Sequence, residues 1–112
     1  MIAWIAVDFD ETLVEATPGF GFEPRGLMPM VSLVRDWIEY TDRGGPEVRI
    51  FTARVSLGEE YIAPVREWSL RTFGRVLAIT NVKDPYCIAI YDNLAFGVEA
   101  NTGRLKCGRH DA

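Results

Sequence analysis

The stretch Trp4-Ile5-Ala6-Val7-Asp8-Phe9-Asp10-Glu11-Thr12-Leu13 decides the fold of this chain. A continuous apolar run of strand type ends in two aspartates that are two residues apart. Because successive side chains on a strand alternate between its faces, Asp8 and Asp10 share a side where the strand ends. Acidic groups crowded there are unfavourable unless a cation or a reaction needs them. Open α/β sheets bind ligands beyond the carboxyl ends of their strands, so the stretch predicts a ligand site.

The rest of the chain alternates between strand and helix patterns. Apolar runs predict a first strand at 2–7 and later strands at 48–52, 76–79 and 87–91, with a short fifth at 96–98. Helical spacing predicts helices at 29–42 and 58–73, the second beginning or kinking at Pro64. Glycines and prolines predict a loop or short hairpin at 13–27, a turn at 101–103 and a loose tail at 103–112. This order predicts a three-layer, Rossmann-like α/β fold, with a mainly parallel sheet and helices on both faces.

Length and composition predict one small domain over residues 1–112. A chain of 112 residues has room for one core. The net charge of −4 and the absence of a basic cluster argue against a large nucleic-acid surface. No apolar run reaches membrane-spanning length and no basic signal start is present, so we expect a cytoplasmic protein. Cys87 and Cys107 are expected to be reduced thiols there.

Polar side chains follow three other apolar runs, where each predicted strand ends: Thr52 and Arg54, then Lys83, then Asp92. If the strands are parallel, these residues meet at the rim that holds the first two aspartates. Such a set suits phosphoryl transfer, in which a carboxylate attacks phosphorus. Two like charges 4 Å apart repel by roughly 4 kcal/mol at an effective dielectric of about 20, so several acids beside a phosphate need a cation. Mg²⁺ prefers carboxylate, phosphate and water oxygens, and we therefore expect Mg²⁺ as the cofactor.

Asp8-Phe9-Asp10-Glu11-Thr12 resembles the DxDxT signature of the haloacid dehalogenase superfamily of phosphatases, and Thr52, Lys83 and Asp92 stand in the order of its later motifs. The resemblance implies a phosphomonoester hydrolase. Asp8 would be the nucleophile that forms an aspartyl-phosphate, and Asp10 the general acid and then base. Thr52 and Lys83 would hold the phosphoryl group. Asp8, the backbone carbonyl of Asp10 and Asp92 would bind Mg²⁺, with Thr12 and Asn93 in supporting positions.

Two residues depart from the family pattern. The family most often has Gly at the position of Glu11, and a second acid at the position of Asn93. The segments 13–28 and 54–83 are too short for an inserted cap domain, so the resemblance implies a capless member with an open site. An open site admits a small phosphorylated molecule or a polymer end. Arg54 is either a contact to the substrate phosphate, the role we assign it, or an exposed salt-bridge partner.

Two other functions remain open from the sequence. One is a receiver-like signalling domain that is phosphorylated on an aspartate, although receivers usually place an adjacent acid pair after the first strand. The other is a non-catalytic binding relative of the same fold, which Glu11 and Asn93 favour. Neither the substrate nor the oligomeric state can be read from the residues.

Overall fold

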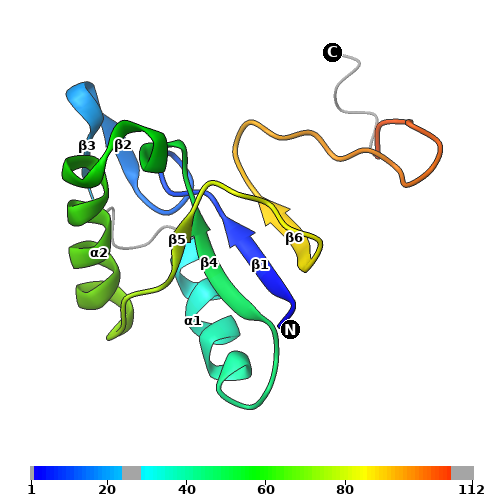
Figure 1. Cartoon of the computed structure of the whole chain (residues 1–112), viewed down its shortest axis with the longest axis horizontal. Coiled ribbons are helices and arrows are strands. Elements are labelled where there is room, and N and C mark those ends of the chain that lie inside the picture. The colour runs from blue at the N-terminus through cyan, green and yellow to red at the C-terminus, as the bar shows by residue number, and fades with distance from the viewer. Residues whose placement is uncertain (1, 24–28, 107–112) are drawn as a thin grey trace.

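A four-stranded parallel sheet forms the centre of the protein (Figure 1), in a computed structural model that describes residues 2–23 and 29–106. The strand order is β5-β4-β1-β6, and every neighbouring pair is parallel. The strands are β1 (Trp4–Val7), β4 (Glu47–Phe51), β5 (Ile79–Thr80) and β6 (Cys87–Tyr91), and the helices are α1 (Pro29–Thr41) and α2 (Glu59–Phe73). A mainly parallel α/β fold was predicted from the sequence and is confirmed. No helix in the described ranges is long and apolar enough to cross a membrane.

The core lies on one face of the sheet, where both helices pack side by side. Val7 and Ile50, which are paired across β1 and β4, belong to the same buried cluster as Val34 of α1 and Trp68 of α2. The side chain of Arg35 on α1 also donates to the carbonyl of Thr72 on α2 at 3.2 Å. Helix α1 has its apolar residues at 31, 34 and 38, a helical spacing that buries one stripe.

The opposite face of the sheet carries no helix within residues 2–23 and 29–106. Trp4 lies there and is fully buried. Its ring packs under the guanidinium of Arg49 at 4.6 Å and beside Phe51, and its indole N–H donates to Asp84 at 2.8 Å. The expectation of helices on both faces therefore differs from the described structure, because the two helices that the pattern predicted pack together on one face.

Other differences from the sequence-based elements have local causes. Strand β5 is two residues long rather than four, because the N–H of Leu77 donates to the Ser69 hydroxyl of α2 instead of to a strand. Helix α2 runs through Pro64 without ending, since Val65 and Trp68 hold the following turn in the core. It stops at Gly74, whose φ of 76° is a conformation that favours glycine.

The segment predicted as a loop or hairpin is an antiparallel hairpin in its described part. It consists of β2 (Glu15–Thr17), a 3₁₀ turn (η1, Pro18–Phe20) and β3 (Gly21–Glu23), while residues 24–28 lie outside the described residues. A second 3₁₀ turn (η2, Ala53–Leu57) links β4 to α2. The predicted fifth strand at 96–98 is not formed, and only an isolated bridge between Val98 and Leu105 is present there. Of the predicted tail, residues 107–112 lie outside the described residues.

Candidate active site

The loop after β1 holds the acidic pair at the carboxyl end of the sheet. Asp8 extends the pairing of β1 with β6, because its N–H donates to the carbonyl of Tyr91 at 2.9 Å. The chain then turns about Phe9, which is fully buried and contacts the rings of Phe22 and Trp68 edge-on. The buried ring between the two aspartates fixes the turn, and it directs both carboxylates away from the core.

Asp8 is the residue whose environment is most perturbed in this loop. Burial raises its pKa from 3.8 to about 6, with repulsion by Asp92 as the second cause and a smaller repulsion by Asp10. The N–H of Phe9 and the Thr12 hydroxyl oppose this shift, and the hydroxyl donates to Asp8 Oδ2 at 3.3 Å. Thr12, for which a supporting role is expected, thus contacts the proposed nucleophile directly.

Asp10 is held by Arg54 through two parallel hydrogen bonds. Nε of Arg54 donates to Asp10 Oδ2 at 2.9 Å, and Nη2 donates to Oδ1 at 2.8 Å. The side chain of Arg54 is 3% exposed, whereas that of Asp10 is 32% exposed and borders the solvent. Bidentate pairing of this kind fixes both the position and the plane of a carboxylate. Asp10 is therefore presented to the cavity in one orientation.

The remaining donors of Arg54 tie three segments together. Nη2 also donates to the carbonyl of Phe20 at 2.7 Å, and Nη1 donates to the carbonyl of Tyr61 at 3.2 Å. The guanidinium lies over the ring of Phe9 at 5.4 Å. Four of its five N–H groups are thus engaged within the protein. Arg54 is a salt-bridge partner, as one of the two sequence readings has it, but it is buried rather than exposed.

Two adjoining cavities lie beside the acidic pair, and Thr52 lines both of them. A cavity of about 230 Å³ is lined by Asp8, Asp10, Thr52 and Arg54 among others. An adjoining cavity of about 370 Å³ is lined by Asp8, Thr52 and Asp92. The Thr52 hydroxyl accepts from the backbone N–H of Arg54 at 3.1 Å, which leaves its own hydrogen free to donate to a ligand. Asp8 and Thr52, which border both cavities, are the centre of the candidate site.

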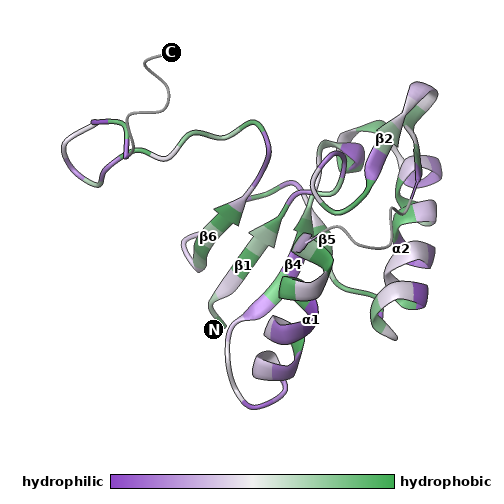
Figure 2. Cartoon of the chain, turned by 180° about the vertical axis from the view of Figure 1, so that it is seen from behind, coloured by the Kyte–Doolittle hydropathy of each residue, from purple (hydrophilic) through white to green (hydrophobic). Residues whose placement is uncertain are grey.

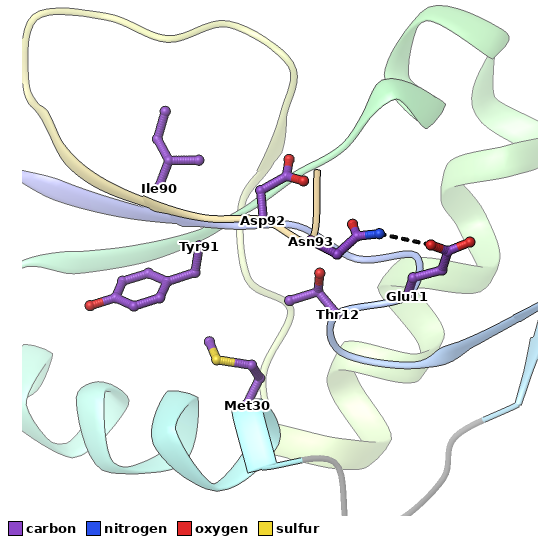
Figure 3. Close-up of a pocket in the computed structure, with 7 residues that line it drawn as sticks. All are labelled: Glu11, Thr12, Met30, Ile90, Tyr91, Asp92 and Asn93. Carbon is purple, nitrogen blue, oxygen red and sulfur yellow. Dashed lines mark hydrogen bonds between the residues drawn. The ribbon is translucent and has the colours of Figure 1, made fainter. Parts of the chain in front are cut away.

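Glu11 and Asn93, the two departures from the family pattern, contact each other. Asn93 Nδ2 donates to Glu11 Oε2 at 2.7 Å, as the dashed line in Figure 3 shows. Glu11 has a φ of 67°, in the left-handed region that favours glycine. The turn after Asp10 thus keeps a glycine-like backbone although glycine is absent. An acid at position 93 would face the Glu11 carboxylate, whereas the amide of Asn93 donates to it.

Figure 3 shows a third hollow, of about 390 Å³, beside this contact. Tyr91 and Met30 lie on one side of it, and the Asp92 side chain points the other way. The Asp92 side chain also accepts from the N–H of Leu94 at 2.7 Å, which holds the start of the following segment. The hollow is open to solvent, and neither Asp8 nor Asp10 lines it.

Lys83 is exposed and does not border either of the cavities that hold the acidic pair. The chain leaves the carboxyl end of the sheet after Thr80 and reaches its amino end at Tyr86, whose carbonyl accepts from the N–H of Trp4 at 2.9 Å. Lys83 lies midway along this descent. Asn81, which the sequence did not single out, lines the larger cavity instead. A phosphate-binding role for Lys83 stays a prediction.

A divalent cation has suitable oxygen donors at this rim. No group of three His, Cys, Asp or Glu side chains arranged to hold a metal occurs in the described ranges. The expected ligands, however, are two carboxylates, those of Asp8 and Asp92, and one backbone carbonyl, that of Asp10. The repulsion by Asp92 that raises the pKa of Asp8 is the electrostatic cost that a cation between them would relieve. The donor chemistry therefore fits a hard cation such as Mg²⁺.

Neither family models nor curated proteins nor solved structures gave a match to this chain.

Three apolar residues at the site were missed by sequence reasoning. Phe20, Leu57 and Leu94 line the smaller cavity beside the acids, and each is partly exposed to solvent. Phe20 has a φ of 62°, and its ring contacts that of Tyr61 edge-on with centroids 5.4 Å apart. The available signal was an aromatic residue flanked by Gly19 and Gly21 in the glycine-rich loop that follows the acids.

Proposed function

We propose that this protein is a Mg²⁺-dependent phosphomonoester hydrolase that works through an aspartyl-phosphate on Asp8. One observation carries the proposal: Asp10, held in one orientation by buried Arg54, borders the same cavity as half-buried Asp8 and the hydroxyl of Thr52. A nucleophile, a proton-transfer group and a donor for a phosphoryl oxygen then lie together. The raised pKa of Asp8, a result of burial and of Asp92, supports a functional role.

The reaction would occur in two displacements. First, an Asp8 oxygen attacks phosphorus, the bond between phosphorus and the leaving oxygen breaks, and Asp10 supplies the proton that this oxygen needs. Both Asp10 oxygens accept from Arg54, so this donation requires one of those hydrogen bonds to be exchanged. In the second displacement a water attacks phosphorus, Asp10 takes its proton, and the bond to Asp8 breaks to release inorganic phosphate. Thr52 would donate to a phosphoryl oxygen throughout.

The metal site would be formed by Asp8, the carbonyl of Asp10 and Asp92. A bound Mg²⁺ supplies charge neutralisation, which lets an anionic nucleophile and a phosphate dianion come together. Lys83 is proposed as an additional cation for the phosphate, and residues 80–86 would have to bring it toward the rim. A capless and therefore open site is part of the same proposal.

The direct test is release of phosphate from an aryl phosphate, with Mg²⁺ and after its removal by a chelator. Turnover that depends on Mg²⁺ and disappears in Asp8→Asn supports the proposal. Equal turnover by both proteins removes it. A phosphoaspartate that persists for hours without turnover would instead indicate a receiver-like domain.

Magnesium is expected to stabilise the protein more at neutral pH than near pH 5. Without metal, the folded state keeps a proton on Asp8 up to about pH 6, whereas the unfolded state loses it near the ordinary value of 3.8. Asp8 therefore lowers the free energy of unfolding as the pH rises between these values, and the loss is complete above about pH 6. A cation competes with that proton, so the rise in Tm on adding Mg²⁺ should be larger at pH 7.

Thermal melts with and without Mg²⁺ at the two pH values measure this difference. Asp92→Asn should shrink the Mg²⁺ effect, whereas Asp36→Asn on the exposed side of α1 should leave it unchanged. An equal rise in Tm at both pH values would contradict a site that contains Asp8.

Phe20 is expected to select for substrates with a planar leaving group. Phe20 is 54% exposed and lines the cavity that holds the acids, and its backbone carbonyl accepts from Arg54 at 2.7 Å. Ring stacking is worth about 0.5–1.5 kcal/mol, so Phe20→Ala should raise KM for an aryl phosphate about 2- to 10-fold. A small alkyl phosphate should be affected little. Steady-state kinetics on both substrates, with Tyr40→Ala on α1 as the control, measures this; equal changes for the two substrates would exclude stacking.

A further inference from the structure

Arg54 is surrounded by apolar groups and needs an anion beside it. Its guanidinium lies over the rings of Phe9, Phe20 and Phe22, at 5.4, 5.9 and 5.6 Å from their centroids. Strands β1 and β4, which lead into the loops of Asp10 and Arg54, end in hydrophobic residues (green in Figure 2). A guanidinium keeps its charge in a protein, and a buried charge without a partner is strongly unfavourable. The negative charge of Asp10 is thus part of what holds Arg54 in place.

The pairing with Arg54 also disfavours a proton on Asp10. A guanidinium carries donors only and cannot accept a hydrogen bond. Both Asp10 oxygens accept from it, Oδ1 at 2.8 Å and Oδ2 at 2.9 Å. A protonated Asp10 would give up part of this bidentate geometry and, with it, the charge that compensates Arg54. The resting side chain is therefore an ionised carboxylate.

An ionised Asp10 serves the two displacements of the proposed reaction unequally. In the second, it can take the proton of the attacking water through a lone pair that Arg54 leaves free, and then return this proton to the solvent that it borders. In the first, the bond between phosphorus and the leaving oxygen breaks, and Asp10 holds no proton to give. The leaving group then departs with the bonding electron pair as an oxyanion and takes its proton from solvent. This step is fast only when that oxyanion is a weak base.

The other side chains around the cavity include one alternative source of a proton. Phe20, Leu57 and Leu94 line the same cavity as Asp10, and their side chains have no hydrogen-bond donor. Glu11 is the carboxyl group that lines this cavity in addition to the two aspartates, and its Oε2 accepts from an asparagine amide at 2.7 Å. Glu11 is therefore the group to compare with Asp10.

We propose that the site selects phosphoryl donors whose leaving group departs as a weakly basic oxyanion, such as a phenolate or a carboxylate, over phosphate esters of alkyl alcohols. The inference rests on the proposed hydrolase function and names its substrate class. Aryl phosphates and acyl phosphates share this chemistry, because phenols and carboxylic acids lose a proton far more readily than alcohols do. The apolar lining that includes Phe20 favours the aryl substrates.

A series of phenyl phosphates with different ring substituents tests this selection, because their planarity is constant while the basicity of the leaving group changes. With Mg²⁺, kcat/KM should fall steeply as that basicity rises. An alkyl phosphate should be slower than the best aryl phosphate by about 10²–10⁴-fold, the usual contribution of a proton donor. Acetyl phosphate, corrected for its spontaneous hydrolysis, should also exceed the alkyl phosphate. Equal kcat/KM values across the series, or an alkyl phosphate that matches the other substrates, would overturn the inference.

Two variants show whether a side chain protonates the leaving group. Asp10→Asn removes one candidate donor and Glu11→Gln removes the other. If neither acts in the first displacement, kcat/KM should depend on leaving-group basicity as steeply in each variant as in the wild type. Loss of the base in the second displacement does not disturb this comparison, because kcat/KM reports the steps up to departure of the leaving group. A steeper dependence in either variant would identify that residue as the proton donor and contradict the inference.

Failure of the inference and failure of the proposed function give different results. Turnover that requires Mg²⁺ and Asp8 but is the same for every leaving group removes the inference and keeps the hydrolase. No turnover of any phosphate in the series, or equal turnover by Asp8→Asn, removes both. If circular dichroism shows that Asp10→Asn does not fold, the wild-type series decides between these outcomes by itself.

Discussion

Asp8→Asn is expected to abolish phosphate release from an aryl phosphate while raising the Tm of the metal-free protein at pH 7. Loss of an enzyme nucleophile lowers kcat by about 10⁴- to 10⁶-fold, because an amide cannot form the covalent intermediate. Stability should move the other way. The pKa of Asp8 is raised to about 6 by burial and by Asp92, so its ionised form at pH 7 is unfavourable in the folded state. The neutral amide removes this charge and keeps nearly the same shape.

The two readouts need to be measured on the same preparation. Steady-state hydrolysis with Mg²⁺ gives kcat, and a thermal melt in chelator gives Tm. Asp36→Asn makes the same chemical change at an exposed position on α1 and should alter neither. A variant that loses activity because it unfolds would show a lower Tm, and this outcome would contradict the electrostatic account of Asp8.

Arg54→Met is expected to lower the free energy of unfolding by about 3–5 kcal/mol and to lower kcat strongly. Removing the buried partner of an ion pair leaves the other charge without compensation, and Asp10, at 32% exposure, is only partly hydrated. Here Asp10 loses both of its bonds to Arg54, and the carbonyls of Phe20 and Tyr61 lose a donor each. Three chain segments are affected together: the β1 loop, the hairpin and α2. Urea denaturation measures the stability, and the aryl phosphate assay measures the activity.

Two variants isolate the cause of this loss. Arg71→Met removes an exposed arginine that pairs with Glu67 at 3.2 Å on α2, and it should cost at most about 1 kcal/mol. The double change Arg54→Met with Asp10→Asn removes both charges, so it should be less destabilising than the sum of the two single changes. If Arg54→Met lowers the free energy of unfolding by less than about 1 kcal/mol, the pair does not stabilise the fold beyond an exposed ion pair.

Much of the sheet could be predicted because its signals are local. Ile2 to Val7 is apolar at every position, as a buried strand requires, and α1 begins at Pro29 as its pattern predicts. The boundaries of β6 were also predicted correctly. Strand β5 was predicted too long, since whether Leu77 pairs with β4 or donates to Ser69 depends on where α2 packs.

Which side chains contact each other at the site could not be predicted in the same way. That Asp10 is clamped by Arg54 depends on a 3₁₀ turn, η2, which turns the Arg54 side chain inward beneath Phe20 and Tyr61. The contact between Glu11 and Asn93 joins residues 82 positions apart. No periodicity in a sequence encodes such contacts, because each depends on how loops meet at a sheet edge.

By itself the sequence determined a parallel α/β sheet whose first strand ends in Asp8 and Asp10, because the alternation of side chains and the apolar run are properties of neighbouring residues. Tertiary structure decided the rest: both helices lie on one face, Arg54 is buried against Asp10, and Glu11 is paired with Asn93. These outcomes depend on packing between distant segments, where burial and hydrogen-bond geometry choose among arrangements that the local pattern permits equally.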